Sequence, residues 1–143
     1  MTNHQKAIAF LFYILVISLL PLKISASLRT EAEALVKWSL SPPLPSWLLT
    51  NHINLCNWDI IFCDNTNTTV SKINLSNPNS SGKLADLDFN SLPNLTLLDL
   101  NGNRFGGSIP SEYGSLSKLS FLDLGNNSLE GTLPSELGQL REL

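Results

Sequence analysis

The chain has 143 residues and a formal net charge of −3, with 9 Lys and Arg against 12 Asp and Glu. This length predicts one compact unit. The absence of any basic run argues against nucleic acid or an anionic membrane surface as a partner.

The first predicted element is a secretory signal peptide over residues 1–26. Lys6 precedes an almost wholly apolar run over 7–20, and small residues follow at 25–27. A charged start, an apolar run and a small-residue end are typical of a signal peptide. The run is shorter than the roughly 20 residues of a membrane-spanning helix. We therefore expect export, with cleavage after Ala26 or the next residue, and no membrane anchor in the chain as given.

A cap region is predicted next, over residues 27–66. Thr30 and Glu33 have the spacing of a capping box, which predicts a short helix from about 31 to 40. Apolar residues follow at helical spacing, and prolines are then expected to end the helix; these residues are Ala34, Leu35, Trp38, Pro42, Pro43 and Pro45. A segment of this kind is suited to cover the open end of a stack of repeats.

The cap region also holds both cysteines, Cys56 and Cys63. Export places them in an oxidising compartment, where a disulfide is the default. Six residues separate them and no second ligand pair exists, so a CxxC redox motif and a zinc site are excluded. The three tryptophans are interpreted as cap core rather than as a ligand cage; they are Trp38, Trp47 and Trp58.

Repeats occupy the rest of the chain, over residues 67–143. Two copies of 24 residues, at 92–115 and 116–139, meet the template LxxLxxLxLxxNx(L/F)xGx(I/L)P at every fixed position. A further copy starts at 140–143. A degenerate first copy occupies 67–91, where Pro78 and Ser80 replace the expected Asn and Leu.

Each repeat predicts one turn of a solenoid. The LxL segments at Leu98 and Leu122 alternate apolar and polar residues, so they are short strands with leucines inward, stacked in parallel around a leucine core. Asn103 and Asn127 come after these strands, and their amides can bond backbone groups of adjacent turns. A simple turn preference is the alternative for both asparagines. Gly107, Gly131, Pro110 and Pro134 are expected to shape the convex return.

The repeat length also predicts outward columns on the concave face. One column contains Lys72, Leu97 and Phe121, and the next contains Asn74, Asp99 and Asp123. An exposed Leu beside an exposed Phe indicates contact with a partner, although an unused apolar surface is an equal alternative. The two aspartates, about 4.8 Å apart, could attract a cation or raise a pKa; the alternative is ordinary solvated Asp.

The sequence predicts glycosylation. Five Asn-x-Ser/Thr sequons carry this prediction; they begin at Asn67, Asn74, Asn79, Asn94 and Asn126.

The sequence does not predict catalysis. His52 is the one histidine after the signal peptide and no free thiol is expected, so no group of residues for nucleophilic catalysis forms. The glycine-rich segment 101–107 lies inside a repeat and is no kinase phosphate loop. We expect no enzyme activity, metal or cofactor.

With these residues in hand, the sequence resembles plant leucine-rich-repeat receptor-like kinases and receptor-like proteins. The plant-type NxLxGxIP segment is present as NRFGGSIP and NNSLEGTLP, and the cap pattern CxWxGVxC as CNWDIIFC, where Ile60 replaces Gly and Ile61 replaces Val. EAEALVKW at 31–38 is similar to the opening helix of these caps. The resemblance implies a plant-type leucine-rich-repeat α/β solenoid with a disulfide cap, displayed outside the cell. It also implies binding of a peptide or protein ligand or a partner receptor, with a membrane helix and a kinase beyond this chain.

Two other interpretations stay open. The same repeat and cap resemble secreted inhibitors of wall-degrading enzymes, and a truncated gene product without an independent role is also possible. The sequence beyond Leu143 would separate a receptor from an inhibitor. The last coil is uncovered in this sequence, so we expect the isolated chain to be poorly stable or to associate.

Overall fold

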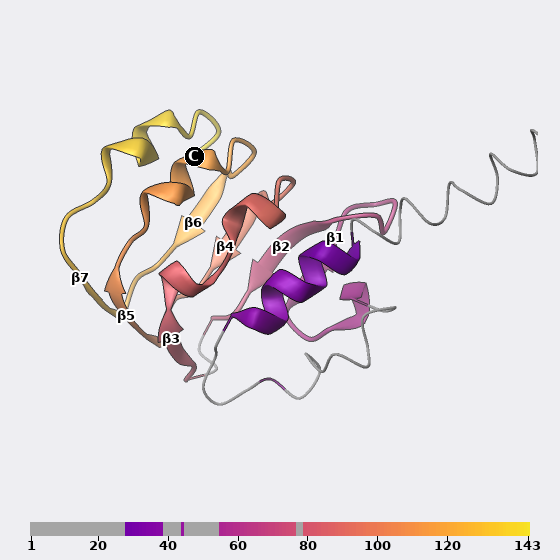
Figure 1. Ribbon diagram of the computed structural model, residues 1–143, viewed down its shortest axis with the longest axis horizontal. Coiled ribbons are helices and arrows are strands. Elements are labelled where there is room, and N and C mark those ends of the chain that lie inside the picture. Colours follow the sequence, from indigo (N-terminus) through magenta and orange to yellow (C-terminus); the bar gives the residue numbers. More distant parts are fainter. Residues whose placement is uncertain (1–27, 39–43, 45–54, 77–78) are drawn as a thin grey trace, which may run out of the picture.

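The computed structural model describes residues 28–38, 44, 55–76 and 79–143 (Figure 1). The expected signal peptide and part of the expected cap lie outside the described residues. Among the residues singled out above, this holds for Pro42, Pro43, Pro45, Trp47, His52 and Pro78.

The N-terminal helix spans residues 28–37, and Trp38 has already left it. The predicted end near residue 40 was therefore about three residues too late, and the predicted capping box was wrong. Thr30 lies inside the helix, and Glu33 accepts a hydrogen bond from Arg29 Nε one turn earlier at 3.0 Å. Leu28, which is also helical, packs against the core.

Four strands form the main sheet, in the order β1-β2-β4-β6 (Figure 1). The strands are β1 (Ile61–Cys63), β2 (Val70–Asn74), β4 (Leu97–Asp99) and β6 (Phe121–Asp123). β1 comes from the disulfide loop and pairs antiparallel with β2, whereas the others pair in parallel, one strand per repeat. The cap is thus continuous with the repeats through one sheet.

A second, three-stranded parallel sheet was not predicted from the sequence. It contains β3 (Ser81–Lys83), β5 (Arg104–Ser108) and β7 (Ser128–Glu130), paired in that order. After these strands the chain returns through short 3-10 helices: η2 (Leu84–Asp86), η3 (Phe89–Ser91), η4 (Ser111–Ser115) and η5 (Ser135–Gln139). Gly107 and Gly131 have φ of +79° and +85°, in the left-handed region that glycine adopts without steric cost, at the turn into this return.

The core is a column of leucines closed at one end by the cap. Leu75, Leu98 and Leu100 are fully buried, and so is Ser80, which stands where the other repeats have Phe105 or Leu129. Trp38 stacks on Phe105 with ring centroids 5.3 Å apart. The Trp38 indole N–H donates to the Lys83 carbonyl at 3.0 Å. Trp38 and Trp58 are both buried, which places these two tryptophans in the core.

The other end of the column is less covered. Leu116 and Leu119 of the last coil are buried, but four of its leucines pack against the core only in part; they are Leu122, Leu124, Leu129 and Leu137. Leu133 keeps 74% of its surface exposed. Burial of one such side chain stabilises a fold by about 1.5–3 kcal/mol, so this coil contributes less than the one before it.

Ile60 has a strained backbone. Its φ is +69°, a left-handed value that costs a residue with a Cβ roughly 1–2 kcal/mol and is an outlier for a β-branched side chain. This is the position where the cap pattern has glycine. The Ile60 carbonyl accepts the Asn74 N–H at 2.9 Å, which ties the conformation to β2.

We expect Ile60→Gly to change the free energy of unfolding by less than about 1 kcal/mol, because the relief of strain offsets the loss of a half-buried side chain. The adjacent Ile61→Gly is the control. Ile61 is buried, so its loss should cost more than about 3 kcal/mol. Urea unfolding of the two variants measures both values, and equal costs at both positions would contradict the strain.

Candidate functional site

The candidate site is the exposed face of the four-stranded sheet, which we call the concave face. The register pairs Lys72 with Leu97 and Leu97 with Phe121. Their neighbours in each strand point inward: Ile73 and Leu98 are fully buried. The outward column expected from the repeat length is therefore present, but Leu97 is half-buried rather than exposed. The role of the column in binding stays a prediction.

The structure adds one residue that the sequence analysis missed. Phe62 in β1 lies opposite Lys72, while its neighbour Ile61 is buried. Phe62 is 52% exposed and Phe121 is 45% exposed, which is unusual for phenylalanine. The alternation of Ile61 inward and Phe62 outward was a strand signal in the sequence, but the antiparallel pairing that aligns Phe62 with the column was not. The column is thus Phe62, Lys72, Leu97 and Phe121.

The second column organises the turns that come after the strands. Asp99 Oδ1 accepts the Asn101 N–H at 3.0 Å, and Asp123 Oδ1 accepts the Gly125 N–H at 2.8 Å. Asn74 Oδ1 also accepts, from the Ser76 hydroxyl at 2.8 Å. Each side chain therefore caps the chain as it leaves its strand.

These bonds give the aspartates a structural role and leave the cation hypothesis without support. The pKa of Asp123 lies below its ordinary value because the carboxylate accepts the Gly125 N–H and the Asn101 side-chain amide. Asn101 Nδ2 lies 3.1 Å from both Asp123 oxygens. In the described part of the chain, no group of three or more His, Cys, Asp or Glu side chains is arranged to hold a metal ion.

Below the concave face, two asparagines join successive coils. Asn103 Nδ2 donates to the carbonyls of Leu75 at 2.6 Å and Leu100 at 2.9 Å, and its Oδ1 accepts the Ser80 N–H at 2.9 Å. Asn127 repeats this one coil later; its partners are the carbonyls of Leu100 and Leu124 and the N–H of Phe105. Both amides thus bond backbone groups of their own and of the preceding coil.

The cap is held by a disulfide and by a buried carboxylate. Cys56 and Cys63 are bonded to each other. Glu31, 1% exposed, reaches from the N-terminal helix to β2, where it accepts the Val70 N–H at 2.9 Å and the Thr69 hydroxyl. Thr69 Oγ1 in turn accepts from Asn94 Nδ2 at 3.1 Å, and Lys118 Nζ donates to Asn94 Oδ1. These bonds connect the helix to three coils.

Burial raises the pKa of Glu31, and the hydrogen bonds from Thr69 and Val70 offset only part of this effect. A carboxyl whose pKa is raised in the folded state stabilises the fold below its unfolded value of about 4.5, and this contribution is lost as the pH rises through the folded pKa. Glu31 is therefore expected to weaken the fold at neutral pH relative to acid pH.

Glu31→Gln tests this. Glutamine resembles the protonated acid, since it can accept from Val70 and donate to Thr69. We expect the variant to be more stable than the parent at pH 7, with the difference shrinking as the pH falls toward 4.5. Urea unfolding of both proteins across this range measures the difference. The opposite contribution of Asp123, whose pKa is lowered, cancels in this difference. That of Asp64, whose pKa is also lowered, cancels only in part, because its charge helps to raise the pKa of Glu31. A difference that does not change with pH would contradict the assignment.

The five sequons occupy three kinds of position. Asn67, Asn79 and Asn126 are exposed, with φ of +54°, +61° and +52° in left-handed turns. Asn74 is exposed on the concave face. Asn94 is half-buried and bonded on both sides, as described above. Glycosylation of any of them stays a prediction.

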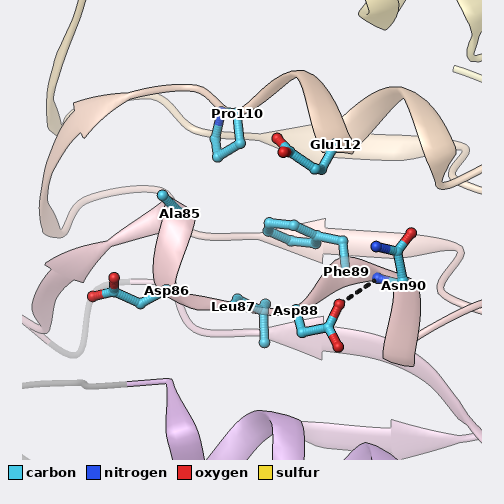
Figure 2. A pocket seen from close by; sticks show the side chains of 8 residues that line it. All are labelled: Ala85, Asp86, Leu87, Asp88, Phe89, Asn90, Pro110 and Glu112. Atoms are coloured by element: carbon cyan, nitrogen blue, oxygen red, sulfur yellow. Dashed lines mark hydrogen bonds between the residues drawn. The ribbon is translucent and has the colours of Figure 1, made fainter.

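A cleft of about 350 Å³ lies on the side of the solenoid that carries the 3-10 helices (Figure 2). Its lining residues are Ala85, Asp86, Leu87, Asp88, Phe89, Asn90, Pro110 and Glu112. Pro110 and Glu112 face the other six from the following coil. Asp88 is engaged in capping η3, since it accepts the Asn90 N–H at 3.1 Å and the Ser91 hydroxyl at 2.7 Å. The cleft contains no pairing of a nucleophile with a base.

The leucine-rich-repeat family model matches residues 94–116 and 118–140. Over 87 residues, or 55% of this chain, the sequence is 38% identical to MDIS1-interacting receptor like kinase 2 of Arabidopsis thaliana. Over 112 residues, or 72% of this chain, it is 35% identical to a probable leucine-rich repeat receptor-like protein kinase of the same plant. The chain spans only 8% and 10% of the length of these two relatives.

Solved structures with a similar fold include plant receptor ectodomains. The leucine-rich-repeat ectodomain of the receptor kinase GASSHO1/SCHENGEN3 from Arabidopsis thaliana, in complex with CASPARIAN STRIP INTEGRITY FACTOR 2, matches 79% of this chain and 14% of its own, with a TM-score of 0.71 and 33% identity. The BIR2 ectodomain from Arabidopsis thaliana matches 80% of this chain and 63% of its own, with a TM-score of 0.68 and 30% identity.

Among the described residues, no helix is long and apolar enough to cross a membrane. The repeats, the disulfide cap and the parallel strands are those of a leucine-rich-repeat solenoid, and the relatives are receptor-like kinases. The chain therefore carries leucine-rich repeats and is similar to plant leucine-rich-repeat receptor-like kinases.

Proposed function

We propose that this chain is a non-catalytic, extracellular binding module for a peptide or protein, and part of the ectodomain of a receptor-like kinase. The observation that carries this proposal is the column of Phe62, Lys72, Leu97 and Phe121 on the concave face. Large apolar side chains rarely gather on a solvated sheet unless a partner covers them. The complex of GASSHO1/SCHENGEN3 with its named factor supports a peptide or protein as the partner.

Export follows from the proposed signal peptide at residues 1–26, with the cap at 27–66 and the repeats at 67–143. The extracellular space is oxidising, which suits the Cys56–Cys63 disulfide. The proposed partners are an extracellular peptide, a protein ligand or a partner receptor. Neither a nucleic acid nor a cofactor has a place in this function.

Selection from a displayed library of random short peptides tests the proposal. The secreted chain is the bait, and selected peptides are then synthesised and titrated by calorimetry. We expect Leu97→Glu to weaken their binding by at least about ten-fold, which is about 1.4 kcal/mol. Leu133→Glu is the matched control, because Leu133 is 74% exposed and lies outside the four-stranded sheet.

Circular dichroism confirms that both variants fold. Peptides that bind the Leu97→Glu variant as tightly as the parent would move the function away from the concave face. A selection that yields no binding peptide would count against a peptide ligand.

A further inference from the structure

The strand register of the four-stranded sheet sets the order of the outward side chains on the concave face. Phe62 and Phe121 stand at the two ends of the column, and Lys72 and Leu97 lie between them. Neighbouring strands lie about 4.8 Å apart, so the four side chains span about 14 Å across the sheet. We call this set of four residues the concave strip.

Lys72 is the cation of this strip. It is exposed, and no hydrogen bond or ion pair occupies its ammonium group within the described part of the chain. Apolar side chains flank it on both sides along the strip, which lowers the local dielectric and strengthens its attraction for an anion. The neighbouring column carries negative charge, since it contains Asp99 and Asp123 about 7 Å further along the strands.

The strain at Ile60 is a second, independent observation at the same end. Ile60 lies two residues before Phe62, and its left-handed φ of +69° is where the chain turns into β1. Residues held in such conformations gather at binding and catalytic sites, where the surrounding structure maintains them. Here the strained turn presents Phe62 outward while Ile61 is buried.

We propose that the concave strip binds an extended peptide with an apolar residue at position i, an acidic residue at i+2 and an apolar residue at i+4. This proposal rests on the function proposed above and specifies its ligand. In an extended chain, residues i, i+2 and i+4 point to one side and span about 14 Å, which matches the distance from Phe62 to Phe121. Such a peptide lies across the strands, parallel to the axis along which the coils stack.

The chemistry selects the order of the three side chains. The apolar residues at i and i+4 cover the exposed faces of the two phenylalanines. The carboxylate at i+2 falls between Lys72 and Leu97, within reach of the flexible lysine stem. A further acidic residue toward Asp99 and Asp123 is disfavoured by like charge.

Two displayed libraries test the proposal, one with Leu-x-Asp-x-Leu fixed and one with Leu-x-Lys-x-Leu fixed, the remaining positions being random. On the parent chain we expect at least ten-fold greater enrichment of the Asp library. Lys72→Glu should reverse this preference. Lys83→Glu is the matched control, because it makes the same charge change at an exposed residue of β3 in the other sheet. It should leave the preference intact.

Phe62→Ala is then titrated with the tightest selected peptide, and we expect a loss of about ten-fold in affinity, with Leu133→Ala as the apolar control. Equal enrichment of both libraries, or a preference that survives Lys72→Glu, would overturn the concave strip while leaving the proposed function intact. If neither these libraries nor the random library yields a binding peptide, the concave strip is overturned and a peptide ligand is excluded from the proposed function, which leaves a protein ligand or a partner receptor.

Discussion

Asn103→Leu is expected to destabilise the fold by about 3–5 kcal/mol, enough to remove most of the stability of a domain of this size. The substitution keeps the branching and the number of heavy atoms of the side chain but removes all of its hydrogen bonds. It leaves the carbonyls of Leu75 and Leu100 and the Ser80 N–H without their partner in a buried region. Each buried group left unsatisfied costs about 1–3 kcal/mol.

Asn127→Leu is the matched control, because Asn127 makes the same set of bonds one coil later. Asn103 is 6% exposed, whereas Asn127 is half-buried and water can replace part of its bonding. We expect a cost of about 1–2 kcal/mol for Asn127→Leu. Thermal or urea unfolding measures both. Equal and small costs would mean that the two asparagines serve only as turn residues.

The repeat pattern predicted what is periodic in this protein. The parallel strands, the inward leucines and the two outward columns all follow from a repeat of 24 or 25 residues, because each coil repeats the same contacts with its neighbour. The second sheet was missed because β5 has the sequence RFGGS, whose glycines weaken any strand signal. Its strands depend on pairing with adjacent coils rather than on local preference.

The cap was harder to predict because its contacts do not repeat. Glu31 was interpreted only through the helix signals around it, yet it is buried and bonded to Val70, 39 residues later. Phe62 was assigned no role, because its place on the concave face depends on the antiparallel pairing of β1 with β2. Ser80 departs from the repeat template. The structure shows it fully buried, in the coil whose Lys83 carbonyl accepts the Trp38 indole.

Gly114→Ala is expected to cost about 1–3 kcal/mol or more, because the new methyl group has no room. It would lie 2.7 Å from both the Cβ and the carbonyl oxygen of Glu136, in the helix η5 of the next coil. Backbone atoms cannot move aside as a flexible side-chain end can, so η4 and η5 must separate. Their separation pulls the last coil, in which Leu122, Leu124, Leu129 and Leu137 are already only partly buried, away from the coil before it.

Gly138→Ala is the matched control for this close contact between coils. Gly138 holds the same place in the next repeat, and nothing lies within 4 Å of where its methyl group would be. Because alanine also favours the folded backbone over glycine, this variant should be neutral or more stable by up to about 1 kcal/mol. Differential scanning calorimetry of the parent and both variants, at several concentrations, measures the difference in stability between the two variants.

If Gly138→Ala is as destabilising as Gly114→Ala, then a further surface packs against the last coil in solution. In that case the difference between the two variants should return on dilution if a second copy supplies that surface. If instead Gly114→Ala proves neutral, the coils are not in the close contact on which this prediction rests.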